Sequence, residues 1–139
     1  MSARETFRGV VYPWQIDQMG HMNVQFYTAR FDEATWHFFA ALGITPDYLR
    51  EQRRAMMAVD QHTQYRKEVL AGALIVITSE LVKLGRSSVR FRHSMRDAIS
   101  GEEVATTELV GVHVDAATRK PVPVPEDFIR RATQEPGAA

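Results

Sequence analysis

The feature that most limits how this 139-residue chain can fold is one long helical pattern followed by four strand-like segments. From residue 23 to residue 42, large apolar residues recur at spacings of three and four, as the buried face of a helix requires. Asn23 is a good N-cap, and Gly43 is a good stop signal. Other faces of this segment also carry aromatic side chains, namely Phe26, Trp36 and Phe39. A helix that is apolar nearly all round is usually buried, so we expect a central helix.

Strand character occurs on both sides of this helix. A first strand is expected at residues 6–14 and is predicted to end near Pro13. Four more segments have alternating or β-branched patterns: residues 56–70, 73–84, 88–96 and 103–115. The turns between these four are too short for parallel crossovers, so hairpins are expected at Ala71-Gly72, Gly85-Arg86 and Asp97–Glu102.

This order of elements predicts an α+β fold in which a five-strand antiparallel sheet wraps around one long central helix. Short helical turns are expected at residues 46–54 and 126–131. Residues 1–132 are predicted to form a single domain, and residues 133–139 are expected to be a disordered tail.

Composition excludes several classes of function. Seventeen basic and seventeen acidic residues cancel, which argues against binding to nucleic acid or to a membrane surface through bulk charge. The chain has no cysteine, so disulfides and cysteine nucleophiles are excluded. No apolar stretch approaches the roughly 20 residues that span a bilayer, and no signal-peptide pattern follows Met1. A cytoplasmic protein is therefore the expectation.

The loop before the long helix carries the residues best suited to chemistry. Asp17, Gly20 and His21 fall within five positions of one another and lead directly to a helix N-terminus. Such an N-terminus offers unpaired N–H groups and a partial positive charge, which can polarise a carbonyl oxygen. An aspartate is ionised at neutral pH and can serve acyl transfer as a nucleophile or general base. A loop aspartate can also be only a turn former.

The neighbouring residues leave alternatives open. His21 can act as a general acid or base, or it can hydrogen-bond the loop backbone. Asn23 is most simply an N-cap, although its side chain could also orient Asp17. Gly20 is expected to supply a backbone conformation that a side chain would forbid.

The register of this loop resembles that of a known family. The pattern Asp17-x-x-Gly-His-Met-Asn-x-x-x-Tyr27, together with the strand order, is similar to hotdog-fold acyl-CoA thioesterases of the 4-hydroxybenzoyl-CoA thioesterase type. The turn Leu-Gly-Arg-Ser-Ser at residues 84–88 and the segment Thr118–Pro121 also resemble the family. The resemblance covers roughly residues 7–130.

The resemblance implies roles for individual residues. Asp17 would attack the thioester carbonyl to give a mixed anhydride, or would activate a water molecule, and the backbone N–H of Val24 would be the oxyanion donor. His21 and Asn23 would belong to the same catalytic group. Substrate-binding positions would be Gly20, Tyr27, Trp14 and Arg86, of which Arg86 would bind the CoA end.

A carboxylate on the helix is a rival for the catalytic role. Some hotdog thioesterases use such a group, which makes Glu33 or Asp32 an alternative to Asp17. The structural interpretation is a helix pair between Arg30 and Glu33.

The implied function is hydrolysis of a small acyl-CoA to the free acid and CoA. One helix and five strands leave an edge strand uncovered, and family members pair such edges into homodimers or homotetramers with the active site at the boundary. Two alternatives stay open: a hotdog dehydratase or hydratase, and a non-catalytic acyl-CoA-binding module.

The sequence leaves the acyl group undetermined. Aromatic residues could enclose an aromatic acyl group, a short aliphatic chain or, through cation–π contact, a quaternary ammonium group. No metal and no bound cofactor are expected, because the five histidines lack metal-ligand spacing and no phosphate-binding glycine motif occurs.

Overall fold

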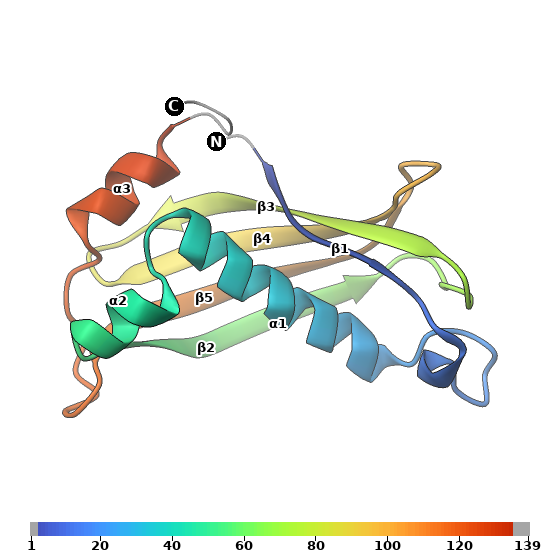
Figure 1. Cartoon of the computed structure of the whole chain (residues 1–139), viewed down its shortest axis with the longest axis horizontal. Helices are drawn as coiled ribbons and strands as arrows, with labels where there is room; N and C mark the ends of the chain where they lie inside the picture. Colours follow the sequence, from blue (N-terminus) through green and yellow to red (C-terminus); the bar gives the residue numbers. More distant parts are fainter. Residues whose placement is uncertain (1–2, 135–139) are drawn as a thin grey trace.

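The computed structural model describes residues 3–134 and contains one five-strand sheet crossed on one face by a long helix (Figure 1). All strand pairs are antiparallel, in the order β1-β3-β4-β5-β2. The strands are β1 (Arg4–Val10), β2 (Arg54–Tyr65), β3 (Leu74–Leu84), β4 (Ser88–Asp97) and β5 (Glu103–Asp115). The helices are α1 (Val24–Ala41), α2 (Pro46–Glu51) and α3 (Glu126–Ala132), with a 3-10 turn η1 (Pro13–Gln15). The predicted α+β arrangement is confirmed. Residues 135–139, most of the expected tail, lie outside the described part.

Helix α1 begins and ends where its capping residues predict. The Asn23 side chain accepts a hydrogen bond from the Gln25 N–H, and Gly43 follows the helix with a φ of +100°. Phe31 and Ala34, on the face toward the sheet, are completely buried. Not every apolar face of this central helix is covered in a single chain, because Trp36 is 44% exposed on the side that faces β2.

The predicted hairpin between residues 56–70 and 73–84 is wrong. β2 pairs with β5, whereas β3 lies between β1 and β4. The connecting residues 66–73 therefore pass the ends of β5 and β4 to reach the start of β3. They are held there because the N–H groups of Arg66 and Lys67 both donate to the Val104 carbonyl, at 2.9 and 3.2 Å. The Ala73 carbonyl accepts from the Val11 N–H at 2.9 Å.

The first strand is shorter than predicted. β1 ends at Val10, because the chain turns at Pro13 into η1 instead of continuing to residue 14. This turn starts the loop of residues 11–23, which lies beyond one end of the sheet and leads into α1 (Figure 1).

β2 is an edge strand with most of its residues exposed. It pairs with β5 on one side, and within residues 3–134 nothing pairs with its other side. Val59 and Tyr65 are at least half exposed on this strand. Uncovered edges of this length are sites where another chain can add a strand.

Within the described residues, no helix has both the length and the apolar character needed to cross a membrane.

Candidate active site

A network of backbone hydrogen bonds folds the loop between β1 and α1 into a tight turn. The Gly20 N–H donates to the Asp17 carbonyl at 3.0 Å, and the Asp17 N–H donates to the His21 carbonyl at 3.1 Å. Gly20 has a φ of +88°, in the left-handed region that L side chains rarely adopt. The turn therefore needs a glycine at this position, and it holds Asp17 at the start of α1.

The carboxylate of Asp17 is fixed by two donors. One oxygen accepts from the Asn23 side-chain amide and the other accepts from the Met19 N–H, both at 2.9 Å. These bonds, that from Asn23 first, lower the pKa of Asp17 below its ordinary value. The side chain remains partly exposed, so it is an ionised carboxylate that solvent and ligands can reach.

Asn23 couples this carboxylate to the helix. Its amide oxygen accepts from the Gln25 N–H at 3.0 Å, while its amide nitrogen donates to Asp17. The two interpretations from sequence, an N-cap and an orienting group, are therefore both present in one side chain. The N–H of Val24, the first residue of α1, has no hydrogen-bond acceptor among residues 3–134. It is available to an oxygen atom of a ligand.

Other predicted site residues support the loop. The ring of His21 lies 3.3 Å from the carboxylate of Glu68, which follows β2. Tyr27 is buried, donates to the Lys67 carbonyl at 3.3 Å, and packs edge-on against Tyr65. The structure thus places Tyr27 where it joins Tyr65 and Lys67 to α1, and leaves it little surface for substrate.

Trp14 and Gln15 occupy the two sides of η1. Trp14 is 69% exposed and packs edge-on against Phe26 at the start of α1. Gln15 was missed by sequence reasoning and is almost fully buried, with its side-chain oxygen accepting from the Tyr12 N–H at 2.8 Å. Its carbonyl accepts from the Asn23 N–H at 2.9 Å. A glutamine in a turn looks like a surface residue, so the sequence carried no signal for this role.

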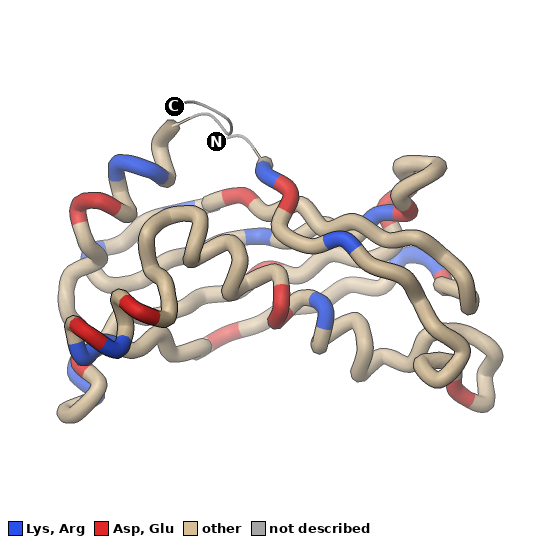
Figure 2. The backbone as a smooth tube through the Cα atoms, viewed as in Figure 1, with Lys and Arg blue, Asp and Glu red and all other residues tan. Residues whose placement is uncertain are grey.

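Arg86 does not join these residues within one chain. It is exposed in the β3–β4 turn, and the loop of residues 11–23 adjoins the other end of β3, where Val10 pairs with Leu74. Eleven strand residues separate the two ends, which corresponds to about 35 Å. No acidic partner lies within ion-pair distance of Arg86 among the described residues. Other arginines of β4 are paired across the sheet, Arg90 with Glu108 and Arg96 with Glu103. In Figure 2 positions of both charges are spread over strands, helices and turns.

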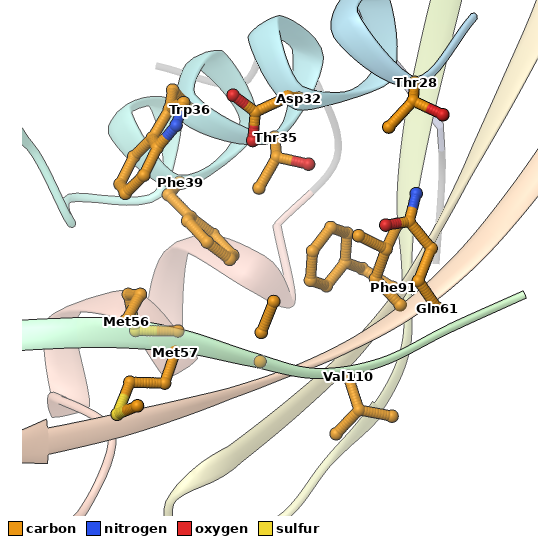
Figure 3. A pocket seen from close by; sticks show the side chains of 13 residues that line it. Thr28, Asp32, Thr35, Trp36, Phe39, Met56, Met57, Gln61, Phe91 and Val110 are labelled. Carbon is orange, nitrogen blue, oxygen red and sulfur yellow. The ribbon is translucent and has the colours of Figure 1, made fainter. Parts of the chain in front are cut away.

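The two rival carboxylates on α1 differ in their surroundings. Glu33 accepts a hydrogen bond from Arg30 at 3.2 Å, as the helix-pair interpretation requires. Asp32 is exposed and lines a cavity between α1 and β2 (Figure 3). Neither contacts Asp17. Within residues 3–134, no cluster of histidine, cysteine, aspartate or glutamate side chains could hold a metal ion.

Known proteins resemble the chain over most of its length. The family model of the thioesterase-like superfamily matches residues 11–132. An L-carnitine dehydrogenase/betainyl-CoA thioesterase of Rhizobium meliloti is 27% identical over 116 residues, which cover 84% of this chain but only 23% of that protein. A betainyl-CoA thioesterase of Pseudomonas aeruginosa is 23% identical over 126 residues, covering 91% of this chain and 79% of that protein.

The fold has similar solved structures as well. A hypothetical protein of Staphylococcus aureus, solved in complex with CoA, superposes with a TM-score of 0.86 at 18% identity and covers 94% of this chain and 83% of its own. This likeness shows the fold, which is the predicted hotdog fold. Because the family model covers most of the chain and the fold agrees with it, this protein belongs to the thioesterase-like superfamily.

Proposed function

We propose that the protein hydrolyses acyl-CoA thioesters, with Asp17 acting on the thioester carbonyl and the N-terminus of α1 binding the oxyanion. The observation that carries this proposal is that two groups occur together at the start of α1. One is the ionised and oriented carboxylate of Asp17, and the other is the N–H of Val24, which has no acceptor among residues 3–134. One well-placed oxyanion donor can contribute on the order of 3 kcal/mol to stabilisation of the transition state. The family membership supports the same reaction class.

In one route, Asp17 is the nucleophile; in the other, it activates a water molecule that attacks the same carbonyl carbon. In the first route a carboxylate oxygen attacks the carbonyl carbon, the tetrahedral oxyanion accepts a hydrogen bond from Val24, and the carbon–sulfur bond breaks to release CoA as a thiolate. Water then hydrolyses the mixed anhydride, which frees the acid and restores Asp17. The pKa of Asp17 lies below its ordinary value, so the carboxylate is ionised at neutral pH, as both direct attack and activation of water require.

A hotdog hydratase or dehydratase is less well supported. Such chemistry needs a carboxylate and a histidine that act on the same substrate carbon atoms. Here His21 pairs with Glu68, and Asp17 is bonded to Asn23 and Met19.

A panel of acyl-CoAs with optical detection of released thiol tests the proposal. Hydrolysis of at least one small acyl-CoA supports a thioesterase. Conversion of an enoyl-CoA without thiol release would indicate a hydratase, and binding without any turnover would indicate a binding module.

The active unit is proposed to be a homodimer, or a homotetramer built from it, joined along β2. The free edge of β2 and the exposed apolar side chains of Val24, Trp36 and Val59 support this assembly. A two-fold axis through the middle of β2 would exchange the two ends of that strand. The loop of residues 11–23, here proposed as the catalytic loop, and the start of α1 lie at the Tyr65 end of β2. The partner's loop would therefore lie over the opposite end, where α2 and the β3–β4 turn are found (Figure 1).

Light scattering at micromolar concentration is expected to give the mass of a dimer or tetramer. A clean monomer would contradict the assembly and the shared active site.

We expect Arg86→Ala to raise KM for acyl-CoA far more than it lowers kcat. In the dimer, Arg86 lies at the end of the sheet where the partner's catalytic loop is placed, so it can bind a CoA phosphate there. A phosphate contact is the same in the ground and transition states, so its loss weakens uniform binding. The expected loss is about 1–3 kcal/mol, as for a charge-assisted hydrogen bond.

Steady-state kinetics with acyl-CoA and with a truncated thioester that lacks the nucleotide check the assignment. Arg8→Ala is the control, because Arg8 is also exposed but is paired with Glu5 at 2.7 Å. If Arg86→Ala impairs both substrates equally, Arg86 does not bind the nucleotide.

A further inference from the structure

A cavity of about 100 Å³ opens between α1 and the first half of β2 (Figure 3). Helix α1 contributes Asp32, Trp36 and Phe39, and β2 contributes Met56 and Met57 on the opposite side. Asp32 is the one ionisable group among the described residues that line the cavity. The remaining wall is largely aromatic, aliphatic and thioether in character.

The Asp32 carboxylate is not committed to any other interaction. Within residues 3–134 it has no hydrogen-bond donor and no basic side chain within 4.0 Å, in contrast to its neighbour Glu33, which is paired with Arg30. Trp36 follows one helical turn later and lies on the same side of α1. Its indole packs edge-on against Phe39, with ring centroids 6.2 Å apart. The cavity thus presents a negative charge next to an aromatic wall.

Two other polar side chains of the wall are already hydrogen-bonded, whereas the Thr28 hydroxyl has no hydrogen-bond partner among residues 3–134. The Thr35 hydroxyl is bonded to His93 at 2.8 Å and to the Phe31 carbonyl at 3.0 Å. The Gln61 amide donates to Thr107 at 3.2 Å. A primary ammonium ion carries three donors and would find few acceptors here. A quaternary ammonium ion has no donors, and a carboxylate with aromatic faces is the surrounding that such cations prefer.

The cavity lies too far from the catalytic loop of its own chain for a small acyl group. Eight residues of helix separate Val24 from Asp32, or about 12 Å along the helix axis. In the proposed dimer the cavity lies close to the catalytic loop of the other subunit instead. The two-fold axis through β2 brings the partner's loop to the end of β2 that carries Met56 and Met57.

We propose that this cavity receives the acyl end of a thioester held at the partner subunit's Asp17, and that it selects acyl groups bearing a quaternary ammonium. This inference rests on the proposed thioesterase function and on the dimer. Asp32 supplies the counter-charge, and Trp36 supplies the aromatic face.

Two substrates of nearly the same shape test the selection. Betainyl-CoA carries a trimethylammonium group, and 3,3-dimethylbutyryl-CoA carries an uncharged tert-butyl group in its place. Binding is measured by calorimetry on Asp17→Asn protein, so that turnover does not interfere. We expect betainyl-CoA to bind at least about tenfold more tightly, and the preference to fall to about threefold or less when Asp32→Asn or Trp36→Leu is added. Glu33→Gln, which removes the same charge one residue away, should leave the preference intact.

Equal affinity for the two esters, or a preference that survives Asp32→Asn, would overturn the inference. Tighter binding of 4-hydroxybenzoyl-CoA than of betainyl-CoA would also overturn it, because Asp32 would then be an acceptor for a hydroxyl group. The proposed function is judged separately: if the wild-type protein releases no thiol from any ester, catalysis fails even where the binding preference is found.

Discussion

The free energy of unfolding is expected to fall by about 2.5 kcal/mol between pH 7 and pH 4.5 because of the buried histidine His93. This side chain is completely buried on β4, where Ser79 bonds one ring nitrogen at 2.6 Å and Thr35 bonds the other at 2.8 Å. Phe31 stacks on the ring with the planes 8° from parallel. Burial lowers the pKa of His93 from 6.5 to about 3.

The direction of this effect follows from proton binding. Between pH 6.5 and pH 3 the unfolded chain binds a proton at His93 and the folded chain does not, so stability is lost as the pH falls. Burial also lowers the pKa of His113, which acts in the same direction.

His93→Phe is the variant that isolates the effect. It retains an aromatic ring, and both hydroxyls keep another partner, because Ser79 contacts Thr6 and Thr35 contacts the Phe31 carbonyl. We expect a lower stability at pH 7 but a loss between pH 7 and pH 4.5 that is smaller by about 2.5 kcal/mol. Thr35→Val keeps the imidazole, so its loss of stability between pH 7 and pH 4.5 should equal that of the wild-type protein.

Urea unfolding at both pH values, at one fixed protein concentration because of the proposed dimer, measures these differences. If His93→Phe lost as much stability between pH 7 and pH 4.5 as the wild-type protein, other groups would be the cause of the acid sensitivity.

Local signals explain why the helix and most strands could be predicted from the sequence. The three-and-four spacing and the caps Asn23 and Gly43 are properties of neighbouring residues. In the structure α1 begins directly after Asn23 and ends two residues before Gly43. The alternation at residues 88–96 likewise placed Phe91 and His93 on one face, which is the buried face of β4.

The pairing of strands that are distant in sequence, and the face of a strand that is buried, could not be predicted in this way. The adjacency of β2 and β5 joins residues that are far apart in sequence, whereas hairpin reasoning considers neighbours only. On β5 the valines at 110 and 112 form an apolar row, yet Leu109 and His113 are the buried residues.

The candidate site was predictable only in part. The loop register brought together Asp17, Gly20 and Asn23, and the structure shows how these residues contact one another. The buried Gln15 and the cavity at Asp32 depend on tertiary packing, for which one sequence has no signal.

Asp17→Asn is expected to lower kcat by about a hundredfold or more, which corresponds to on the order of 3 kcal/mol. The substitution keeps the size of the side chain and its ability to accept from Met19, but it removes the negative charge and the nucleophilic oxygen. The protein should stay folded and still bind acyl-CoA. Glu33→Gln should lower kcat much less, because Glu33 is paired with Arg30 on the helix surface.

The rate of thiol release from an accepted acyl-CoA, measured side by side for the wild-type protein, Asp17→Asn and Glu33→Gln, tests the central claim most directly. Our account predicts a collapse of turnover in Asp17→Asn alone, with circular dichroism showing that the variant is folded. Near-normal turnover in Asp17→Asn with a collapse in Glu33→Gln would move catalysis to the helix. If neither substitution changed thiol release, catalysis by these carboxylates would be contradicted.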